Sequence, residues 1–404
     1  MNILFICDEY PPGKNGGIGT MVQVLGRELF RQGHSVTVIG LYPYYYGEKD
    51  FEIDQGVEVH RLRYGINFGR KNRNFFYKVM GKMPDFIKKR LNGKKAFEKF
   101  IVKIKSLIEE KKIDIIEIQD WSSFVFNIGF HIEWPQFKVP LVVKSNGSYT
   151  YFCDEMKVIG KEKFLNVDKA LYKRADALSS VSCYTESVNK RLFNYTQGVK
   201  ILYNSIETPS IKIDESKKAK TFIFTGTLIK KKGIFQLAQA WNIVTKKHSD
   251  AILEIYGKGE INAIKELLNE TSQNTVQFKG HVGREMLFQE LSRATAAIFP
   301  SYSECFALAP LEALAVGCPV INTSKASGKE LIIDGENGSL IDPDNIEEIA
   351  EKIIELMEHK GLQKKYAQKG RETILEKFTI AKSAEDHISF YKEVVQNFNK
   401  EKNN

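Results

Sequence analysis

The stretch that decides the fold runs from Pro300 to Val320 and reads PSYSECFALAPLEALAVGCPV. The apolar residues 296–299 just before it predict a buried strand, and Pro310 fits the first turn of a following helix, where its missing N–H costs no hydrogen bond. Two carboxylates, Glu304 and Glu312, flank that helix start. Ligands of open α/β sheets bind beyond the carboxyl ends of the strands, so this loop is a predicted ligand site.

The chemistry of the loop fits a nucleotide sugar. A helix start presents unpaired N–H groups and a partial positive charge, which favour an anion such as a diphosphate. A carboxylate accepts hydrogen bonds from two hydroxyls, so one glutamate could hold a ribose and the other a sugar. The spacing alone leaves a second interpretation open, in which Glu312 only complements the helix dipole and Glu304 is a loop charge.

The bulk composition is that of a globular protein. The chain has 404 residues, enough for two or three domains, with 43% hydrophobic and 27% charged residues. No apolar run approaches ~18 residues, and the opening MNILFICDEY lacks the basic start of a signal peptide. Five cysteines without a CxxC pair favour free thiols in a reducing compartment, so we expect a cytoplasmic protein.

Strand and helix patterns alternate twice along the chain. Residues 2–7 predict a strand, residues 18–33 an amphipathic helix and residues 35–40 a second strand, which is a βαβ unit and implies a parallel sheet. The alternation resumes after a polar, lysine-rich stretch, with predicted strands at 221–226, 251–257, 275–280, 296–300 and 319–323. We therefore predict two doubly wound α/β domains, a linker and a C-terminal helix that returns to the first domain: 1–203, 204–219, 220–380 and 381–404.

Residues 301–345 resemble the large family of retaining GT-B glycosyltransferases often called family 4. That family has two acidic residues separated by seven others, then the pattern EA-A-G-PV, a glycine-rich turn with Glu, and the pattern GENG-L. The matching residues are Glu304, Glu312, Ala313, Ala315, Gly317, Pro319, Val320, Gly328, Glu330 and 335–338. The resemblance implies the GT-B fold, an α/β architecture of two Rossmann-like doubly wound domains facing a central cleft.

The resemblance extends along the chain and implies roles for further residues. The loop with Gly16 and Gly17 matches the one that approaches the donor phosphates and the acceptor, and glycines permit such close approach. Lys232 matches the lysine that neutralises the donor diphosphate. The implied donor-binding residues are Gly16, Gly17, Thr227, Lys232, Gly257, His281, Val282, Glu304, Phe306, Ala307, Leu308 and Glu312, and the implied catalytic residues are Glu304, Asn146 and Lys232.

The sequence departs from the family pattern in three segments. Thr227 stands where the family often has Arg, so diphosphate binding leans more on Lys232 and its lysine neighbours. Asn146 stands where the family often has a His near the reaction centre; an amide keeps a donor and an acceptor but cannot carry an imidazolium charge. Cys305 and Ala307 replace the small glycines around Phe306, and their main-chain N–H groups could still bind sugar hydroxyls.

The implied function is that of a retaining hexosyltransferase. It would move a glycosyl unit from a nucleoside-diphosphate sugar to an acceptor hydroxyl, in the assembly of a cell-surface polysaccharide or a glycolipid. Two alternatives stay open: a GT-B nucleotide-sugar epimerase or hydrolase, and a catalytically weak sugar-nucleotide binding protein, which Thr227 and Asn146 suggest. No cluster of Asp, His or Cys suggests a metal, and GT-B enzymes are similarly metal-independent, so no cofactor is expected.

The formal charge of +9 is unevenly placed. Residues 69–112 carry fifteen Lys or Arg against four Asp or Glu, with interleaved aromatics. One interpretation is a solvated helical surface, and another is binding to an anionic membrane, on whose inner face a lipid-linked acceptor would be found. Nucleic-acid binding is disfavoured because no recognised motif accompanies the charge.

Overall fold

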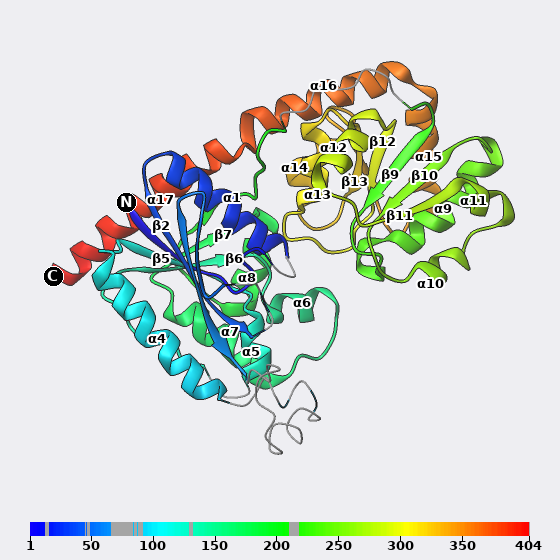
Figure 1. The fold of residues 1–404 in the computed structure, drawn as a ribbon. Helices are drawn as coiled ribbons and strands as arrows, with labels where there is room; N and C mark the ends of the chain where they lie inside the picture. Colours follow the sequence, from blue (N-terminus) through cyan, green and yellow to red (C-terminus); the bar gives the residue numbers. More distant parts are fainter. Residues whose placement is uncertain are drawn as a thin grey trace. The chain divides into compact units, whose positions relative to one another are not determined.

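The structure is a computed structural model. It describes residues 1–12, 16–44, 46, 49–65, 84, 87, 92–128, 132–209 and 218–403. The chain divides into two compact units (Figure 1). The first comprises Met1–Val181, Thr185–Leu202 and Ser383–Asn404, and the second comprises Ser182–Tyr184 and Tyr203–Lys382.

The expected linker and the C-terminal helix can be located in this division. The described ends of the linker, residues 204–209 and 218–219, belong to the second unit, while 210–217 lie outside the described residues. The last helix, α17 (Ile380–Asn403), starts in the second unit and belongs to the first from Ser383 onward.

The first unit is a doubly wound α/β structure. Within the described residues its sheet has eight strands in the order β3-β4-β2-β1-β5-β6-β7-β8, all parallel except the β3–β4 pair. Besides α17, its elements are β1 (Asn2–Ile6), α1 (Gly17–Arg31), β2 (Ser35–Pro43), β3 (Phe51–Asp54), β4 (Val57–Tyr64), α4 (Gly93–Glu110), β5 (Ile115–Gln119), α5 (Ser123–Ile128), β6 (Leu141–Ser145), α6 (Tyr149–Glu155), α7 (Glu162–Arg174), β7 (Ala177–Ser180), α8 (Cys183–Phe193) and β8 (Val199–Ile201).

The two faces of this sheet differ in character. Alternate residues of a strand point to opposite faces, so Ile116 and Ile118 join the apolar core that includes Phe100 of α4. Glu117 and Gln119 point to the other face and are nevertheless buried. That second face is covered in part by α17, whose polar side chains contact it.

The second unit has the strand order of a dinucleotide-binding fold. Its sheet is parallel, in the order β11-β10-β9-β12-β13-β14, which is the 3-2-1-4-5-6 order of doubly wound sheets. Its elements are β9 (Thr221–Thr225), η1 (Lys230–Lys232), α9 (Ile234–Lys247), β10 (Ile252–Tyr256), α10 (Ile261–Lys265), α11 (Glu270–Thr275), β11 (Val276–Gly280), α12 (Arg284–Arg293), β12 (Ala296–Phe299), α13 (Leu308–Ala315), β13 (Val320–Thr323), α14 (Gly328–Leu331), β14 (Ser339–Ile341), α15 (Ile346–Glu358) and α16 (Lys360–Lys377).

Helices cover both faces of the second sheet, as Figure 1 shows, with α9 and α15 on one side and α12 and α13 on the other. The central strands β9, β10, β12 and β13 are mostly apolar and buried, as expected of parallel sheets, whereas the edge strand β11 is partly exposed. Trp241 of α9 is fully buried in the same core. The chain direction puts the loops after β9, β10, β11 and β12 at one edge of the sheet. The ligand-binding edge of such a sheet is therefore formed by residues of these loops.

Candidate functional site

The loop that follows β12 starts the candidate site. Helix α13 begins at Leu308, so Pro310 lies in its first turn as predicted. Glu312 is the fifth residue of α13, two residues further along than in a helix that begins at Pro310, because α13 begins at Leu308. The interpretation of Glu312 as a first-turn residue that only complements the helix dipole is therefore wrong.

Glu304 and Lys232 are brought together by the fold. Lys232 ends the short 3₁₀ turn after β9, and Glu304 lies in the loop after β12, the neighbouring strand. Their side chains form an ion pair, and both are largely buried, with 27% and 16% of the side chain exposed. The main-chain oxygen of Glu304 also accepts a hydrogen bond from Ser327 Oγ at 3.2 Å. The pair is partly buried, so it is less screened by water than an ion pair on the open surface.

Glu312 has a partner that the sequence did not indicate. Arg284, the first residue of α12, places its Nε 3.2 Å from Glu312 Oε1. Burial raises the pKa of Glu312, and the guanidinium of Arg284 acts in the opposite direction. Arg284 is one of many basic residues in this chain, and only the approach of α12 to α13 distinguishes it.

A pocket of about 370 Å³ lies at the same sheet edge. Three turns line it, after β9, β10 and β11, together with Leu287; the lining residues are Thr225, Gly226, Thr227, Tyr256, Gly257, Lys258, Gly280, His281, Val282 and Leu287. The pocket thus unites Thr227, Gly257, His281 and Val282, which the sequence predicted as donor-binding. Its volume lies within the range of ligand pockets, about 300–1,000 Å³.

Phe306 and Ala307 are placed beside the glutamate. The ring of Phe306 is buried against Tyr203 and Phe378, with ring centroids at 4.9 and 5.5 Å. Its main-chain oxygen accepts a hydrogen bond from Asn204 Nδ2 at 2.8 Å. Ala307 is the N-cap of α13, and Leu308 is the first helical residue. The aromatic packing therefore fixes the loop, and the main chain of 306–308 is what can face a ligand.

Gly16 and Gly17 stand at the start of α1 in the first unit. Gly16 is the N-cap, in extended conformation, and Gly17 is the first residue of the helix. A Cβ on Gly16 would lie 2.3 Å from Glu9 Oε2, so the carboxyl group of Glu9 lies directly against this turn. Only a glycine fits there while Glu9 keeps its place.

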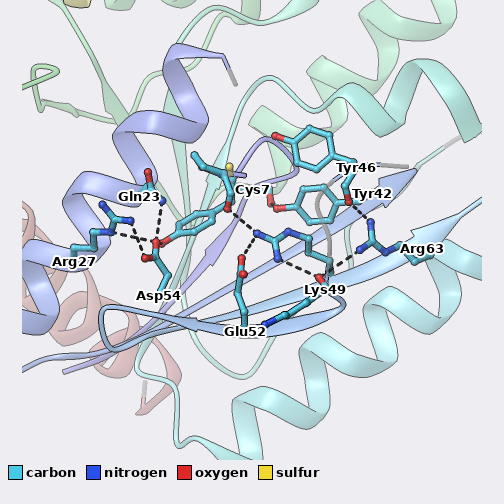
Figure 2. A network of polar contacts seen from close by, with 12 residues as sticks. Cys7, Gln23, Arg27, Tyr42, Tyr46, Lys49, Glu52, Asp54 and Arg63 are labelled. Carbon is cyan, nitrogen blue, oxygen red and sulfur yellow. Dashed lines mark hydrogen bonds and ion pairs between the residues drawn. The ribbon is translucent and has the colours of Figure 1, made fainter. Parts of the chain in front are cut away.

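Buried polar contacts hold the segment that leads to this turn (Figure 2). The guanidinium of Arg61, fully buried, donates to the main-chain oxygens of Pro11 at 2.7 Å and Lys49 at 3.1 Å and pairs with Glu52. Tyr42 Oη donates to the main-chain oxygen of Cys7 at 2.6 Å. The segment 7–11 is therefore anchored at both ends by side chains of β2 and β4.

Asn146 follows β6 and has its amide hydrogens engaged. Nδ2 donates to Gln119 Oε1 at 2.6 Å and to the main-chain oxygen of Lys144 at 3.1 Å. Its main-chain N–H donates to Asp120 Oδ1 at 2.8 Å. Among the contacts of the described residues, none involves Asn146 Oδ1. Asn146 can therefore offer a ligand an acceptor but not its amide donor.

Comparison with known proteins places this geometry. Residues 206–373 match the family described as glycosyl transferases group 1, and residues 15–209 match glycosyltransferase family 4. The chain belongs to the family 4 glycosyltransferases. An uncharacterised glycosyltransferase of Methanocaldococcus jannaschii is 25% identical over 97% of this chain and 98% of its own.

Solved structures show the GT-B fold for this glycosyltransferase. Sucrose-phosphate synthase from Thermosynechococcus elongatus has a TM-score of 0.73 and 19% identity, over 98% of this chain and 99% of its own. The Anabaena protein HepE, in complex with UDP and glucose, has a TM-score of 0.65 and 16% identity, over 97% of this chain and 100% of its own.

In the described part of the glycosyltransferase, no group of three or more His, Cys, Asp or Glu is arranged to hold a metal ion. Metal independence stays a prediction. Across the same residues, no helix combines the length and apolar character needed to span a bilayer.

The glycosyltransferase should not tolerate a side chain at Gly257. Gly257 has φ +143°, and a Cβ there would lie 1.8 Å from the main-chain oxygen of Gly226. We expect Gly257→Ala to destabilise the second unit by at least about 3 kcal/mol. The cost of the strained φ and the cost of the steric overlap between Cβ and the main-chain oxygen of Gly226 add to each other. Gly280→Ala is the matched control: φ is +71°, nothing lies within 4 Å, and a cost of about 1–2 kcal/mol is expected. Urea denaturation measures both, and equal costs would contradict the close-approach argument.

A pH dependence is expected from Glu9. Burial, and then the neighbouring Asp8, raise the pKa of Glu9 to about 7 from 4.5. The folded chain therefore binds this proton more tightly than the unfolded chain, and the stabilisation it gives is lost as pH rises from 4.5 through 7. Relative to Glu9→Gln, the wild type should lose up to about 3 kcal/mol over that range. Urea denaturation at several pH values measures it, with Glu98→Gln as an exposed control; a pH-independent difference would contradict the expectation.

Proposed function

We propose that the glycosyltransferase moves a sugar from a nucleoside-diphosphate sugar to an acceptor hydroxyl with retention of configuration. The observation that carries the proposal is the partly buried Lys232–Glu304 pair at the same sheet edge as the pocket of about 370 Å³. The complex of HepE with UDP and glucose supports it at the level of the fold. A preformed cation is what a departing diphosphate requires, because electrostatic stabilisation is commonly the largest catalytic contribution.

The nucleoside, the diphosphate and the sugar of the donor would each bind different residues of the candidate site. The pocket lined by Gly257, His281 and Val282 takes the nucleoside, and Glu312 accepts hydrogen bonds from the ribose hydroxyls. Lys232 neutralises the diphosphate, and the hydroxyl of Thr227 and the N–H groups of the first turn of α13 donate hydrogen bonds to it. Gly16 and Gly17 would allow the phosphates to approach the main chain closely. Glu304 and the main chain of 306–308 take the sugar. Asn146 accepts a hydrogen bond from a sugar hydroxyl through Oδ1.

The reaction step is a substitution at the anomeric carbon. The bond from that carbon to the diphosphate oxygen breaks, and the diphosphate leaves with the electron pair. The acceptor oxygen bonds to the same carbon from the same face, and its proton passes to the leaving phosphate. Lys232 stabilises the charge that develops on the diphosphate, and the sugar contacts of Glu304 and Asn146 hold the carbon in place.

Two alternatives predict different products. An epimerase or hydrolase would consume the donor without an acceptor, and a binding protein would retain the donor unchanged. The proposed role of Lys232 favours a catalyst over a binding protein, because an ammonium beside the diphosphate would stabilise the charge that develops as this group leaves. The test is a panel of nucleotide sugars in thermal shift, because a ligand of the folded state raises its melting temperature. Nucleoside-diphosphate release with and without saccharide acceptors follows for each hit; tight binding without turnover would overturn the proposal.

The acceptor is proposed to belong to cell-surface polysaccharide or glycolipid assembly, on or near the inner face of the membrane. The basic segment 69–112 supports this, although 69–83, 85–86 and 88–91 lie outside the described residues. Phe97 and Phe100 are two of the interleaved aromatic residues on which the membrane interpretation is based. Both lie on α4 and are buried in the core, so they cannot contact a membrane. Exposed lysines of α4, together with Lys112, can meet anionic lipid in the described part of the segment. Flotation with anionic and neutral vesicles separates membrane binding from a solvated surface.

The two glutamates should respond differently to substitution. We expect Glu312→Ala to weaken donor and free nucleoside diphosphate alike, about tenfold, since hydrogen bonds to a charged group contribute about 1.5–3 kcal/mol. Glu304→Ala should lower turnover about tenfold or more while leaving nucleotide affinity in place. Calorimetry with the plain nucleoside diphosphate measures affinity.

Arg284→Met is the matched control for Glu312, since it removes the other half of the same ion pair. If Glu312 binds the ribose, Glu312→Ala should lower nucleoside-diphosphate affinity more than Arg284→Met does. Equal losses for Glu312→Ala and Arg284→Met would assign Glu312 to the ion pair alone, and equal nucleotide losses for both glutamates would contradict the division of roles.

A further inference from the structure

Polar side chains are buried behind Asn146, on the face of the first sheet that α17 covers. Glu117 and Gln119 are alternate residues of β5 and are 1% and 2% exposed. Lys144, paired with Gln119 in register on β6, is equally buried. Buried polar groups cost free energy unless they are hydrogen-bonded, so an arrangement of this kind requires a reason beyond packing.

The contacts form a continuous chain from the C-terminal helix to Asn146. Tyr391 Oη of α17 donates to Glu117 Oε2 at 2.7 Å. Gln119 Nε2 donates to Glu117 Oε1 at 2.9 Å. Asn146 Nδ2 then donates to Gln119 Oε1 at 2.6 Å. Every link joins a donor to an acceptor, and each residue except Asn146 is buried.

The direction of this chain is set by Glu117. A carboxylate only accepts hydrogen bonds, so Gln119 must turn its Nε2 toward it. Gln119 Oε1 then faces Asn146. Because Oε1 is an acceptor, Asn146 must donate to it through Nδ2. The main-chain oxygen of Lys144, also an acceptor, takes the second amide hydrogen. Asn146 is thereby left with Oδ1 as its open atom, and the orientation of a symmetric-looking amide becomes defined.

A second contact fixes α17 on the same face without joining the chain. Lys144 Nζ lies 2.9 Å from His387 Nε2, and His387 Nδ1 lies 2.6 Å from the main-chain oxygen of Ser383. A neutral His387 that donates through Nδ1 accepts a hydrogen bond from Lys144 Nζ through Nε2, which agrees with a pKa of His387 held well below its usual value by burial. His387 thus docks the helix, whereas Tyr391 contacts the chain that leads to Asn146.

We propose that Glu117, Gln119 and Tyr391 are positioning residues that hold Asn146 with Oδ1 toward the sugar. The C-terminal helix then contributes to turnover through Tyr391, although it touches no substrate. This inference rests on the proposed function, in which Asn146 accepts a hydrogen bond from a sugar hydroxyl.

The test is a double-substitution cycle on the full chain. Glu117→Gln replaces the carboxylate by a group that can donate, so Gln119 is no longer required to present Oε1 to Asn146. Asn146 Nδ2 then keeps only the main-chain oxygen of Lys144 as a fixed acceptor, and its amide is held less firmly. We expect kcat for nucleoside-diphosphate release to fall about tenfold, with nucleoside-diphosphate affinity unchanged. In the Asn146→Ala background the same substitution should have no further effect, because the group being positioned is gone. Tyr391→Phe, which removes one oxygen atom, should give a smaller fall with the same non-additivity.

His387→Gln is the control, since it disturbs the docking of α17 without belonging to the chain. It should lower the melting temperature without the kcat loss of Tyr391→Phe. Losses of kcat that add to that of Asn146→Ala, or unchanged kcat in both Glu117→Gln and Tyr391→Phe, would overturn the inference while leaving the proposed function intact. A wild-type chain that binds donors and consumes none would overturn the proposed function, and the inference with it.

Discussion

Lys232→Met should lower donor turnover by about 10²- to 10³-fold, the loss usual for one group that stabilises a developing charge. The lysine is the cation paired with Glu304, and methionine keeps its length without its charge. The substitution also leaves the largely buried Glu304 carboxylate without its partner, and that charge would repel a departing diphosphate. Nucleoside-diphosphate release at saturating donor measures the effect on kcat.

Lys230→Met is the matched control, because Lys230 lies in the same 3₁₀ turn and its side chain is exposed. Exposed charges contribute little, so a loss of no more than about threefold is expected there. Lys232→Arg should recover only part of the activity, since a planar guanidinium does not reproduce the point charge of an ammonium. Similar losses for Lys230→Met and Lys232→Met would assign the effect to the charge of the whole turn rather than to the buried pair.

The fold of the second unit could be predicted closely because its strands are short apolar runs separated by turn residues. The predicted strands at 221–226, 251–257, 275–280, 296–300 and 319–323 coincide with β9 to β13. The strand β14 was missed because its three residues give no periodicity to detect. The antiparallel strand β3 in the first unit, of four residues, was missed for the same reason.

The candidate site was predicted as a set of residues and not as a set of contacts. Glu304, Lys232 and Glu312 were found through a resemblance, since each alone is an ordinary charge in a charged chain. The Lys232–Glu304 pair joins positions 72 residues apart, and Arg284 reaches Glu312 from another helix. Such pairings depend on which strands are neighbours, and that order is a property of the sheet rather than of any local pattern.

The burial of Glu117, Gln119 and Lys144 shows the same limit in the first unit. Polar residues at alternate positions of a strand are compatible with an exposed face as well as with a covered one. Only the arrival of α17, more than 240 residues later in the chain, makes them buried. The segment around Asn146 could therefore be aligned with the family from sequence, while the orientation of its amide could not be predicted.

Asn146→Ala should slow turnover by about 10²-fold, in line with losing one preorganised polar contact. The substitution removes the Oδ1 acceptor and also two hydrogen bonds that hold the loop after β6. Asn146→Asp separates these effects: it keeps an oxygen in the place of Oδ1 but has no hydrogen to donate to Gln119. If the acceptor alone matters, Asn146→Asp keeps most of the activity. If the orientation matters too, it approaches the alanine variant.

Asn146→His introduces the residue that the family often has at this position. An imidazole can donate to Gln119 through one nitrogen and accept from the sugar through the other, which is the same division that the amide achieves. We therefore expect Asn146→His to be tolerated or to turn over faster than the wild type. Nucleoside-diphosphate release with the cognate donor, with and without acceptor, measures all three variants. Release that is unchanged in Asn146→Ala would show that residues 145–147 do not correspond to the family's catalytic segment. Glu117 would then have no catalytic group to position.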